Sequence, residues 1–138
     1  MKKVLIVEDD FYIRDIYSKN FAQGGYIVEV ASDGEEAIEK AKSSSFDIIL
    51  LDIMLPKITG LDVLRNYRDD VSNVKNTPVF MITNLGQEDI IKEAFKIGAD
   101  GYLIKAQLTP KDIVREINNF FAQQEKMTAS NQPPKTST

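Results

Sequence analysis

The stretch IILLDIMLP, residues 48–56, joins a continuous apolar run to a single acid, Asp52, and ends in a proline. Four aliphatic residues in a row are typical of a strand whose two faces are both covered, as in parallel sheets with helices on each side. We therefore predict a central buried strand over residues 48–51. Asp52 then stands where the chain leaves the sheet.

Four further apolar runs flank this strand along the chain, and the segments between the runs have helical spacing. Ile13, Tyr17 and Phe21, for example, fall on one face of a helix. Five strands that alternate with five helices predict an α/β fold with a parallel sheet. The second run contains Glu29 and fits an edge strand. The four runs are residues 4–7, 27–31, 79–82 and 102–104.

The C-terminal part of the chain divides into a helix and a polar segment. Thr109 as a cap, Pro110 at the first helical position and Asp112 three residues after the cap predict the start of the fifth helix. From about Met127 the chain is polar and shows no periodicity. We expect one domain over residues 1–126, followed by a flexible polar tail or truncated linker over residues 127–138.

Length and composition exclude several classes of function. The 138 residues leave room for one domain, and their net charge of −4 gives no electrostatic basis for direct binding to nucleic acid or to an anionic membrane. The chain has no Cys and no His, which excludes disulfides, thiolate nucleophiles and imidazole acid–base chemistry. No apolar run has the length of a signal-peptide core or a membrane span, so we expect a cytoplasmic protein.

Polar residues stand directly after four of the five apolar runs. Ligands of parallel α/β sheets bind outside the carboxyl ends of the strands, and we expect the first, third, fourth and fifth strands to be neighbours. These polar side chains are then expected to share one pocket. In chain order they are the acids of residues 8–10, Asp52, Thr83 and Lys105.

Each of these residues taken singly also has a structural explanation. Asp10 can cap the first helix, and Asp52 can end a strand before a turn. Together the residues favour function, because several carboxylates in one pocket repel one another unless a hard cation binds between them. The carboxylates of Glu8, Asp9 and Asp52 are oxygen ligands suited to Mg²⁺.

Phosphoryl transfer is the chemistry that fits this set of groups. A carboxylate beside Mg²⁺ can act as a nucleophile toward phosphorus, and Asp52 is the natural choice because it is the lone acid after the central strand. Lys105 supplies a cation for the phosphoryl oxygens, and the Thr83 hydroxyl supplies a hydrogen-bond donor to one of them.

At these residues the sequence resembles the receiver domain of two-component response regulators, from Lys2 to about Gln124. The resemblance implies a flavodoxin-like (βα)5 fold in three layers with the strand order 2-1-3-4-5, as in single-domain regulators of the chemotaxis type. The matching motifs are Val-Glu-Asp-Asp at 7–10, Leu-Asp-Ile-Met-Leu-Pro at 51–56 followed by Gly60, Ile-Thr at 82–83, and Gly-Ala-Asp-Gly-Tyr-Leu-Ile-Lys at 98–105.

The resemblance further implies that Asp52 accepts a phosphoryl group from a histidine kinase or a histidine phosphotransfer protein in a phosphorelay. Asp9, Asp52 and the backbone carbonyl of Met54 are then the Mg²⁺ ligands, with Glu8 acting through water. Lys105 and Thr83 hold the phosphoryl oxygens. Such a domain is not an enzyme in the usual sense, since it catalyses only its own phosphorylation and slow dephosphorylation.

The same resemblance implies a switch. Thr83 and Tyr102 are its residues, and they change the face formed by the fourth helix, the fifth strand and the fifth helix, which binds a downstream protein. The domain is expected to be a monomer or a phosphorylation-dependent dimer.

Three departures from the family pattern bear on the site. Ala106 stands where the family usually has a proline in a cis peptide, and a cis bond before Ala costs about 2.5 to 4 kcal/mol, so we expect the loop after the fifth strand to differ. Asn84 replaces a small residue beside Thr83. Met54 and Leu85 occupy positions that tune hydrolysis of the acyl phosphate, and both are apolar. We hypothesise restricted water access there.

Alternative readings remain open. A degenerate receiver would keep the fold as a phosphorylation-independent protein-binding module, and the chain could also be the receiver fragment of a longer multidomain regulator. An FMN-binding flavodoxin is disfavoured because three acids stand where its phosphate loop belongs. A phosphatase of the haloacid dehalogenase type normally has a second Asp two residues after the nucleophile, where this chain has Met54.

Overall fold

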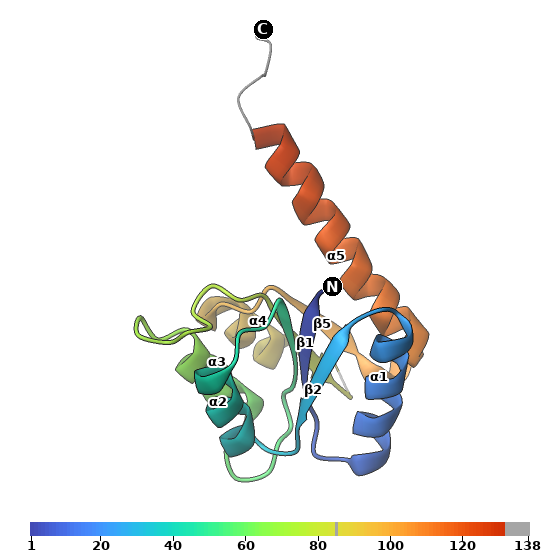
Figure 1. The fold of residues 1–138 in the computed structure, drawn as a ribbon. Helices are drawn as coiled ribbons and strands as arrows, with labels where there is room; N and C mark the ends of the chain where they lie inside the picture. Colours follow the sequence, from blue (N-terminus) through green and yellow to red (C-terminus); the bar gives the residue numbers. More distant parts are fainter. Residues whose placement is uncertain (85, 132–138) are drawn as a thin grey trace, which may run out of the picture.

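The computed structural model of the chain describes residues 1–84 and 86–131, with the side chains of 129–131 excepted. Five parallel strands form one sheet in the order β2-β1-β3-β4-β5, and five helices cover it (Figure 1). The predicted flavodoxin-like topology is confirmed. The strands are β1 (Lys3–Val7), β2 (Ile27–Ala31), β3 (Ile48–Asp52), β4 (Val79–Thr83) and β5 (Gly101–Ile104).

The helices lie in two layers, one on each face of the sheet. Helices α2 (Gly34–Ser43), α3 (Gly60–Tyr67) and α4 (Glu88–Ile97) pack on the face that presents Leu5, Ile49 and Met81. Helices α1 (Phe11–Gln23) and α5 (Pro110–Asn131) pack on the opposite face. Strands β1 and β3 lie inside the sheet, with neighbours on both sides. A short 3-10 helix, η1 (Lys105–Gln107), connects β5 to α5.

The alternation of the strands explains these two cores. Successive side chains of a strand point to opposite faces, so Leu5 enters the core under α2 and α3 while Ile6 enters the core under α1 and α5. All five residues of β3 are buried, as the continuous apolar run predicts. Ile27 of β2 is 47% exposed, which confirms β2 as an edge strand.

Strands β1 and β5 begin one residue earlier than predicted, and strands β3 and β4 end one residue later. Asp52 pairs with Ile82 as the last residue of β3, and Thr83 pairs with Ile104 as the last residue of β4. Both polar residues are therefore held by the sheet itself and do not belong to the loops that follow. Backbone pairing with the next strand, on one side of each residue, outweighs the polarity of the side chains.

Helix α5 extends beyond residue 126, into the segment expected to be a flexible tail or linker. The helix runs on to Asn131, so residues 127–131 are helical, and residues 132–138 of the expected tail lie outside the described residues. The physical reason is that no glycine or proline interrupts the chain between Pro110 and Pro133. Figure 1 shows the C-terminal half of α5 projecting away from the body of the domain.

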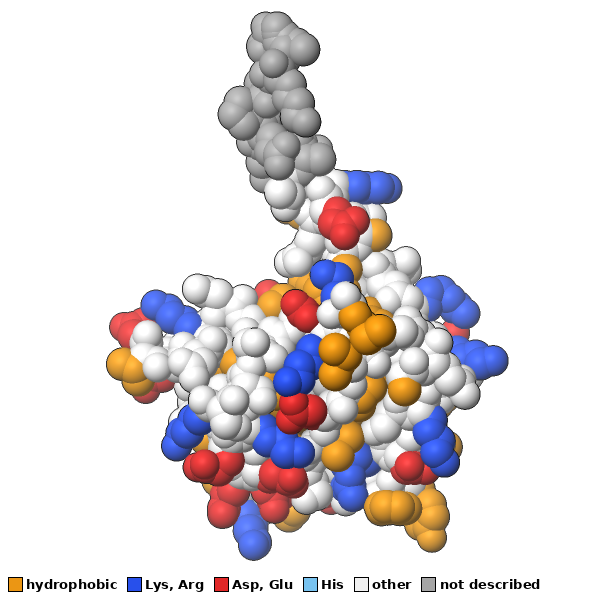
Figure 2. Space-filling model, in the orientation of Figure 1, with side chains coloured by type: hydrophobic (Ala, Val, Ile, Leu, Met, Phe, Trp, Pro, Cys, Tyr) orange, Lys and Arg blue, Asp and Glu red, His pale blue; other side chains and the backbone are white. Residues whose placement is uncertain are grey.

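The surface seen in Figure 2 carries acidic and basic side chains side by side, without an extended patch of one sign among the coloured residues. Several charged side chains of the domain pair locally along one helix, as Lys19 does with Asp15 and Lys92 with Glu88. In the described part of the chain, no helix combines the length and the apolar character needed to cross a membrane.

Candidate functional site

The first group of site residues follows β1. Asp10 caps α1, because its Oδ1 accepts hydrogen bonds from the backbone N–H of Tyr12 at 2.9 Å and of Ile13 at 3.1 Å. Asp10 is thus the N-cap of α1, as its structural explanation predicted. Glu8 is buried and Asp9 is exposed. Carboxylate oxygens of Glu8, Asp9 and Asp52 all lie within 4.8 Å of one another.

Asp52 reaches this group from the end of the central strand β3. Its side chain is 4% exposed, and its Oδ1 accepts a hydrogen bond of 2.9 Å from the backbone N–H of Met54. Gly60, the first residue of α3, packs directly on it, since an added Cβ would lie 2.2 Å from the Asp52 carbonyl oxygen. Only glycine permits this approach, which fixes the backbone that carries the Asp52 carboxylate.

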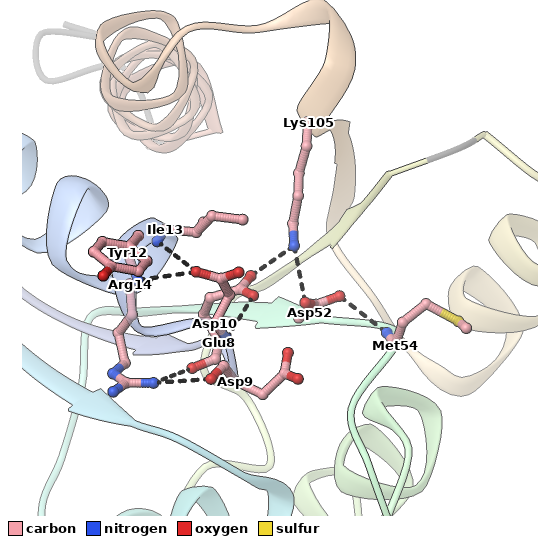
Figure 3. A network of polar contacts seen from close by, with 9 residues as sticks. All are labelled: Glu8, Asp9, Asp10, Tyr12, Ile13, Arg14, Asp52, Met54 and Lys105. Carbon is pink, nitrogen blue, oxygen red and sulfur yellow. Dashed lines mark hydrogen bonds and ion pairs between the residues drawn. The ribbon is translucent and has the colours of Figure 1, made fainter.

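Lys105 enters the pocket from η1, beyond the end of β5. Its Nζ lies 2.6 Å from Glu8 Oε2 and 2.9 Å from Asp52 Oδ2, and all three side chains are less than a tenth exposed (Figure 3). The Lys105 ammonium group thus contacts Glu8 and Asp52, which precede it by 97 and 53 positions in the sequence. The Lys105–Ala106 peptide is trans.

The electrostatics of the pocket follow from this crowding. Burial raises the pKa of Glu8 to about 7, and the charge of Asp52 adds to the rise, while the hydrogen bond from Lys105 opposes it. For Lys105, burial lowers the pKa, but its hydrogen bonds to Glu8 and Asp52 outweigh that effect and the pKa is raised. The Lys105 ammonium group therefore pairs with two carboxylates at once, those of Glu8 and Asp52.

The donor set fits a hard divalent cation. Three carboxylates from two neighbouring strand ends meet at one point, with Asp9 open to solvent. Mg²⁺ prefers one or two carboxylates and keeps several waters, so an exposed ligand beside two buried ones suits it. The Met54 backbone carbonyl lies in the loop that follows Asp52, and its predicted role as a ligand stays a prediction.

Thr83 lies at the same edge of the sheet, one strand further along. Its side chain is buried and lines a cavity of about 270 Å³ next to Met54 and the start of α4. Asn84 lines the same cavity and is exposed. Leu85, which was expected with Met54 to limit water access, lies outside the described residues. The Met54 side chain itself is 64% exposed.

Tyr102 lies on edge strand β5, away from the acidic cluster. Its ring is 42% exposed and packs edge-on against Phe95 of α4, with 6.0 Å between ring centroids. The described conformation is thus an outward one, and the expected inward turn stays a prediction.

Sequence reasoning missed one residue of this site, Arg14. Its guanidinium lies under the loop after β1 and donates to the backbone carbonyls of Glu8 and Asp9 (Figure 3). A contact to backbone carbonyls has no signature in the sequence. The only available signal was the position of Arg14 four residues after the cap Asp10, which places it at the top of α1.

Comparison with known sequences agrees with this geometry. A family model of the response regulator receiver domain matches residues 4–118. Transcriptional regulatory protein ResD of Bacillus subtilis is 32% identical over 135 residues, or 96% of this chain and 54% of that protein. Probable transcriptional regulator ycf27 of Guillardia theta is 35% identical over 129 residues, or 94% of this chain and 49% of that protein. The chain spans about half the length of these curated relatives.

Solved structures give the same result. Chemotaxis protein CheY4 of Vibrio cholerae superposes with a TM-score of 0.80 at 34% identity, covering 86% of this chain and 98% of that one. A chain of the CheX-CheY-BeF3-Mg²⁺ complex from Borrelia burgdorferi superposes with a TM-score of 0.78 at 32% identity, covering 87% of this chain and 89% of that one. With the family model matched from strand β1 into helix α5, this chain belongs to the response regulator receiver domains.

Proposed function

We propose that Asp52 is the phosphoacceptor of this receiver domain and that it takes a phosphoryl group from a histidine kinase or a histidine phosphotransfer protein. The observation that carries the proposal is the position of the Asp52 carboxylate, at the end of the central strand, within 4.8 Å of two further carboxylates and 2.9 Å from Lys105. An isolated strand-end acid would need none of these neighbours.

The transfer itself needs one nucleophile and several stabilising groups. An Asp52 oxygen forms a bond to phosphorus while the bond from phosphorus to the donor's imidazole nitrogen breaks, and the electron pair leaves with that nitrogen. Bound Mg²⁺ supplies positive charge to the phosphoryl oxygens. Lys105 Nζ already contacts Asp52 and is placed to hold a second oxygen. Asp9, Asp52 and the Met54 carbonyl hold the ion, with Glu8 acting through water.

A relative supports the metal and the phosphoryl site. A chain of the CheX-CheY-BeF3-Mg²⁺ complex from Borrelia burgdorferi is 32% identical to this chain. The clustered carboxylates of Glu8, Asp9 and Asp52 support a Mg²⁺ site of the same kind in this chain. Receiver domains are signalling domains and not enzymes of the classical kind, so the catalysis we propose is limited to the domain's own phosphorylation and slow dephosphorylation.

The proposed output is a change of surface. Thr83 hydrogen-bonds the phosphoryl group, and Tyr102 turns inward beside the cavity lined by Thr83 and Ile90. These movements alter the face of α4, β5 and α5, to which a downstream protein binds in the cytoplasm. The domain acts as a monomer or a phosphorylation-dependent dimer.

The test is the mass of the intact protein after incubation with Mg²⁺ and acetyl phosphate. We expect a gain of about 80 Da, the mass of one phosphoryl group, that requires Mg²⁺ and is absent in Asp52→Asn. Asp70→Asn, which changes an exposed acid paired with Lys75, is the matched control and should gain the same mass. No gain in a protein that binds Mg²⁺ would overturn the proposal in favour of a degenerate receiver.

A further inference from the structure

Arg14 lies on the first turn of α1, directly below the loop that carries the acids. Its backbone N–H donates to the Asp10 carbonyl at 2.9 Å, as part of the helix. Its side chain turns back toward the strand, where Nη1 donates to the Glu8 carbonyl at 2.8 Å and lies 3.4 Å from the Asp9 carbonyl (Figure 3). One guanidinium thus contacts the backbone of two consecutive acidic residues.

The charge of Arg14 is not used to pair with a carboxylate. Within residues 1–84 and 86–131, Arg14 forms no ion pair, and its other contact is the ring of Phe11, 5.6 Å away at the centroid. Lys105 differs in this respect, because it contacts two carboxylates directly. Arg14 therefore acts on the backbone of the loop, and Lys105 acts on its side chains.

Asp9 is the residue most dependent on this backbone contact. The Glu8 carboxylate is fixed by Lys105 and by the backbone N–H of Asp10. In the described part of the chain, the Asp9 carboxylate is exposed and accepts no hydrogen bond. Its position is consequently set by where the backbone of the loop is held.

We propose that Arg14 is a positioning residue that holds the backbone of Glu8 and Asp9 so that the Asp9 carboxylate is ready to bind Mg²⁺. The inference deepens the proposed function and rests on its metal site. Groups that orient metal ligands without touching the ion commonly change metal affinity by ten- to a hundredfold.

The proposed positioning effect and a purely electrostatic effect change the affinity for Mg²⁺ in opposite directions. Arg14 is a cation close to a cation site, so its charge alone opposes Mg²⁺ binding, and its removal would strengthen binding. Loss of the backbone contact acts in the opposite direction, because Asp9 must then be ordered when the ion binds. The direction of the change in affinity separates the two effects.

The experiment is isothermal titration of the full chain with Mg²⁺ alone, at a temperature where melting curves show each variant to be folded. We expect Arg14→Met to raise the dissociation constant for Mg²⁺ about tenfold. Arg14→Lys keeps the charge but offers only a point donor, so we expect a loss of about threefold. Lys19→Met removes an exposed cation from the same helix and should bind as the unaltered protein does.

The possible outcomes are distinct from one another. Unchanged or tighter binding by Arg14→Met, in a protein whose Asp9→Asn variant binds weakly, overturns the positioning role and leaves the proposed function intact. Absence of Mg²⁺ binding by the unaltered chain overturns both. A variant that is less stable without Mg²⁺ but binds the ion with unchanged affinity shows a structural role only, and also overturns the proposal.

Discussion

Charged side chains lie at both ends of the sheet, but the ratio of cations to carboxylates differs between the two ends. At the amino end, Arg68 donates to Asp100 and to the carbonyls of Val74, Lys75 and Gly98, at 2.9 to 3.1 Å. Asp100 also accepts from the backbone N–H of Val79 at 2.8 Å. One cation and one acid meet there, and each finds partners.

At the carboxyl end, Lys105 is the one cation among the described residues that pairs with carboxylates of the group formed by Glu8, Asp9 and Asp52, because the nearby Arg14 contacts backbone carbonyls. An excess of buried like charge costs free energy, and folding alone gives no reason to keep it. The balanced cluster at the amino end is what stability requires. The unbalanced cluster is what the binding of a cation would require, and this difference supports the proposed function at the carboxyl end.

Removal of Arg68 should give the largest effect on stability. Arg68→Met leaves Asp100 without its cation and removes a donor from three carbonyls, of which that of Val74 keeps another partner, the Thr77 N–H. We therefore expect unfolding to become easier by about 3 kcal/mol. Thermal melting followed by circular dichroism measures this. Arg65→Met, which removes an exposed arginine from the same helix, should cost less than about 0.5 kcal/mol. Equal costs for the two variants would remove the basis of the comparison.

Mg²⁺ should stabilise only through the carboxyl end. At ten times its dissociation constant the ion should raise the free energy of unfolding by about 1.4 kcal/mol. The increase should disappear in Asp9→Asn and persist in Asp100→Asn, as measured by melting temperature with and without a chelator. Loss of the effect in Asp100→Asn would place the ion at the wrong end of the sheet.

Neutralising one acid at each end should change stability in opposite directions. Without metal, Asp52→Asn relieves repulsion with Glu8 and keeps an oxygen for the Met54 N–H. It removes the ion pair with Lys105, but Lys105 retains Glu8 as its partner, so we expect a net gain of up to about 1 kcal/mol. Asp100→Asn weakens the pair with Arg68 and should cost about 1 kcal/mol. Denaturant unfolding of both variants decides the point, and two changes of the same sign would contradict the difference drawn here.

The smallest effect concerns acids at helix starts. Hydrogen bonds from Thr59 lower the pKa of Asp62, and hydrogen bonds from Thr109 lower the pKa of Asp112. A lowered pKa means stability that is present above the unfolded value near 3.8 and is lost as the pH falls below it. Melting between pH 5 and pH 2.5 should therefore show a shallower loss in Asp62→Asn than in the unaltered chain. An identical slope would show that this cap contributes nothing.

The sequence predicted most of what depends on side-chain pattern. The apolar runs located all five strands, and Asp52, Glu8 and Lys105 were expected together because they follow neighbouring strands. Thr109 and Asp112 were recognised as a helix start, and their reciprocal hydrogen bonds are present.

Features that depend on backbone contacts could not be predicted in this way. The Arg14 side chain binds carbonyl groups, which every residue has, so its identity carries no information about its partner. The close approach of Gly60 to Asp52 is likewise a property of how α3 packs on β3. The helical state of residues 127–131 was not predicted, because a run of polar residues without glycine or proline is equally compatible with a helix and with a tail.

Because α5 is long, a small change of angle at its first turn produces a large displacement at its last turn. Its root follows η1, whose first residue is Lys105, and its far end stands clear of the domain (Figure 1). At 1.5 Å per residue the helix is about 33 Å long, so a tilt of about 10° at the root would displace the far end by about 6 Å. A rearrangement at the pocket that tilted this root would therefore move the far end of the helix by several ångströms.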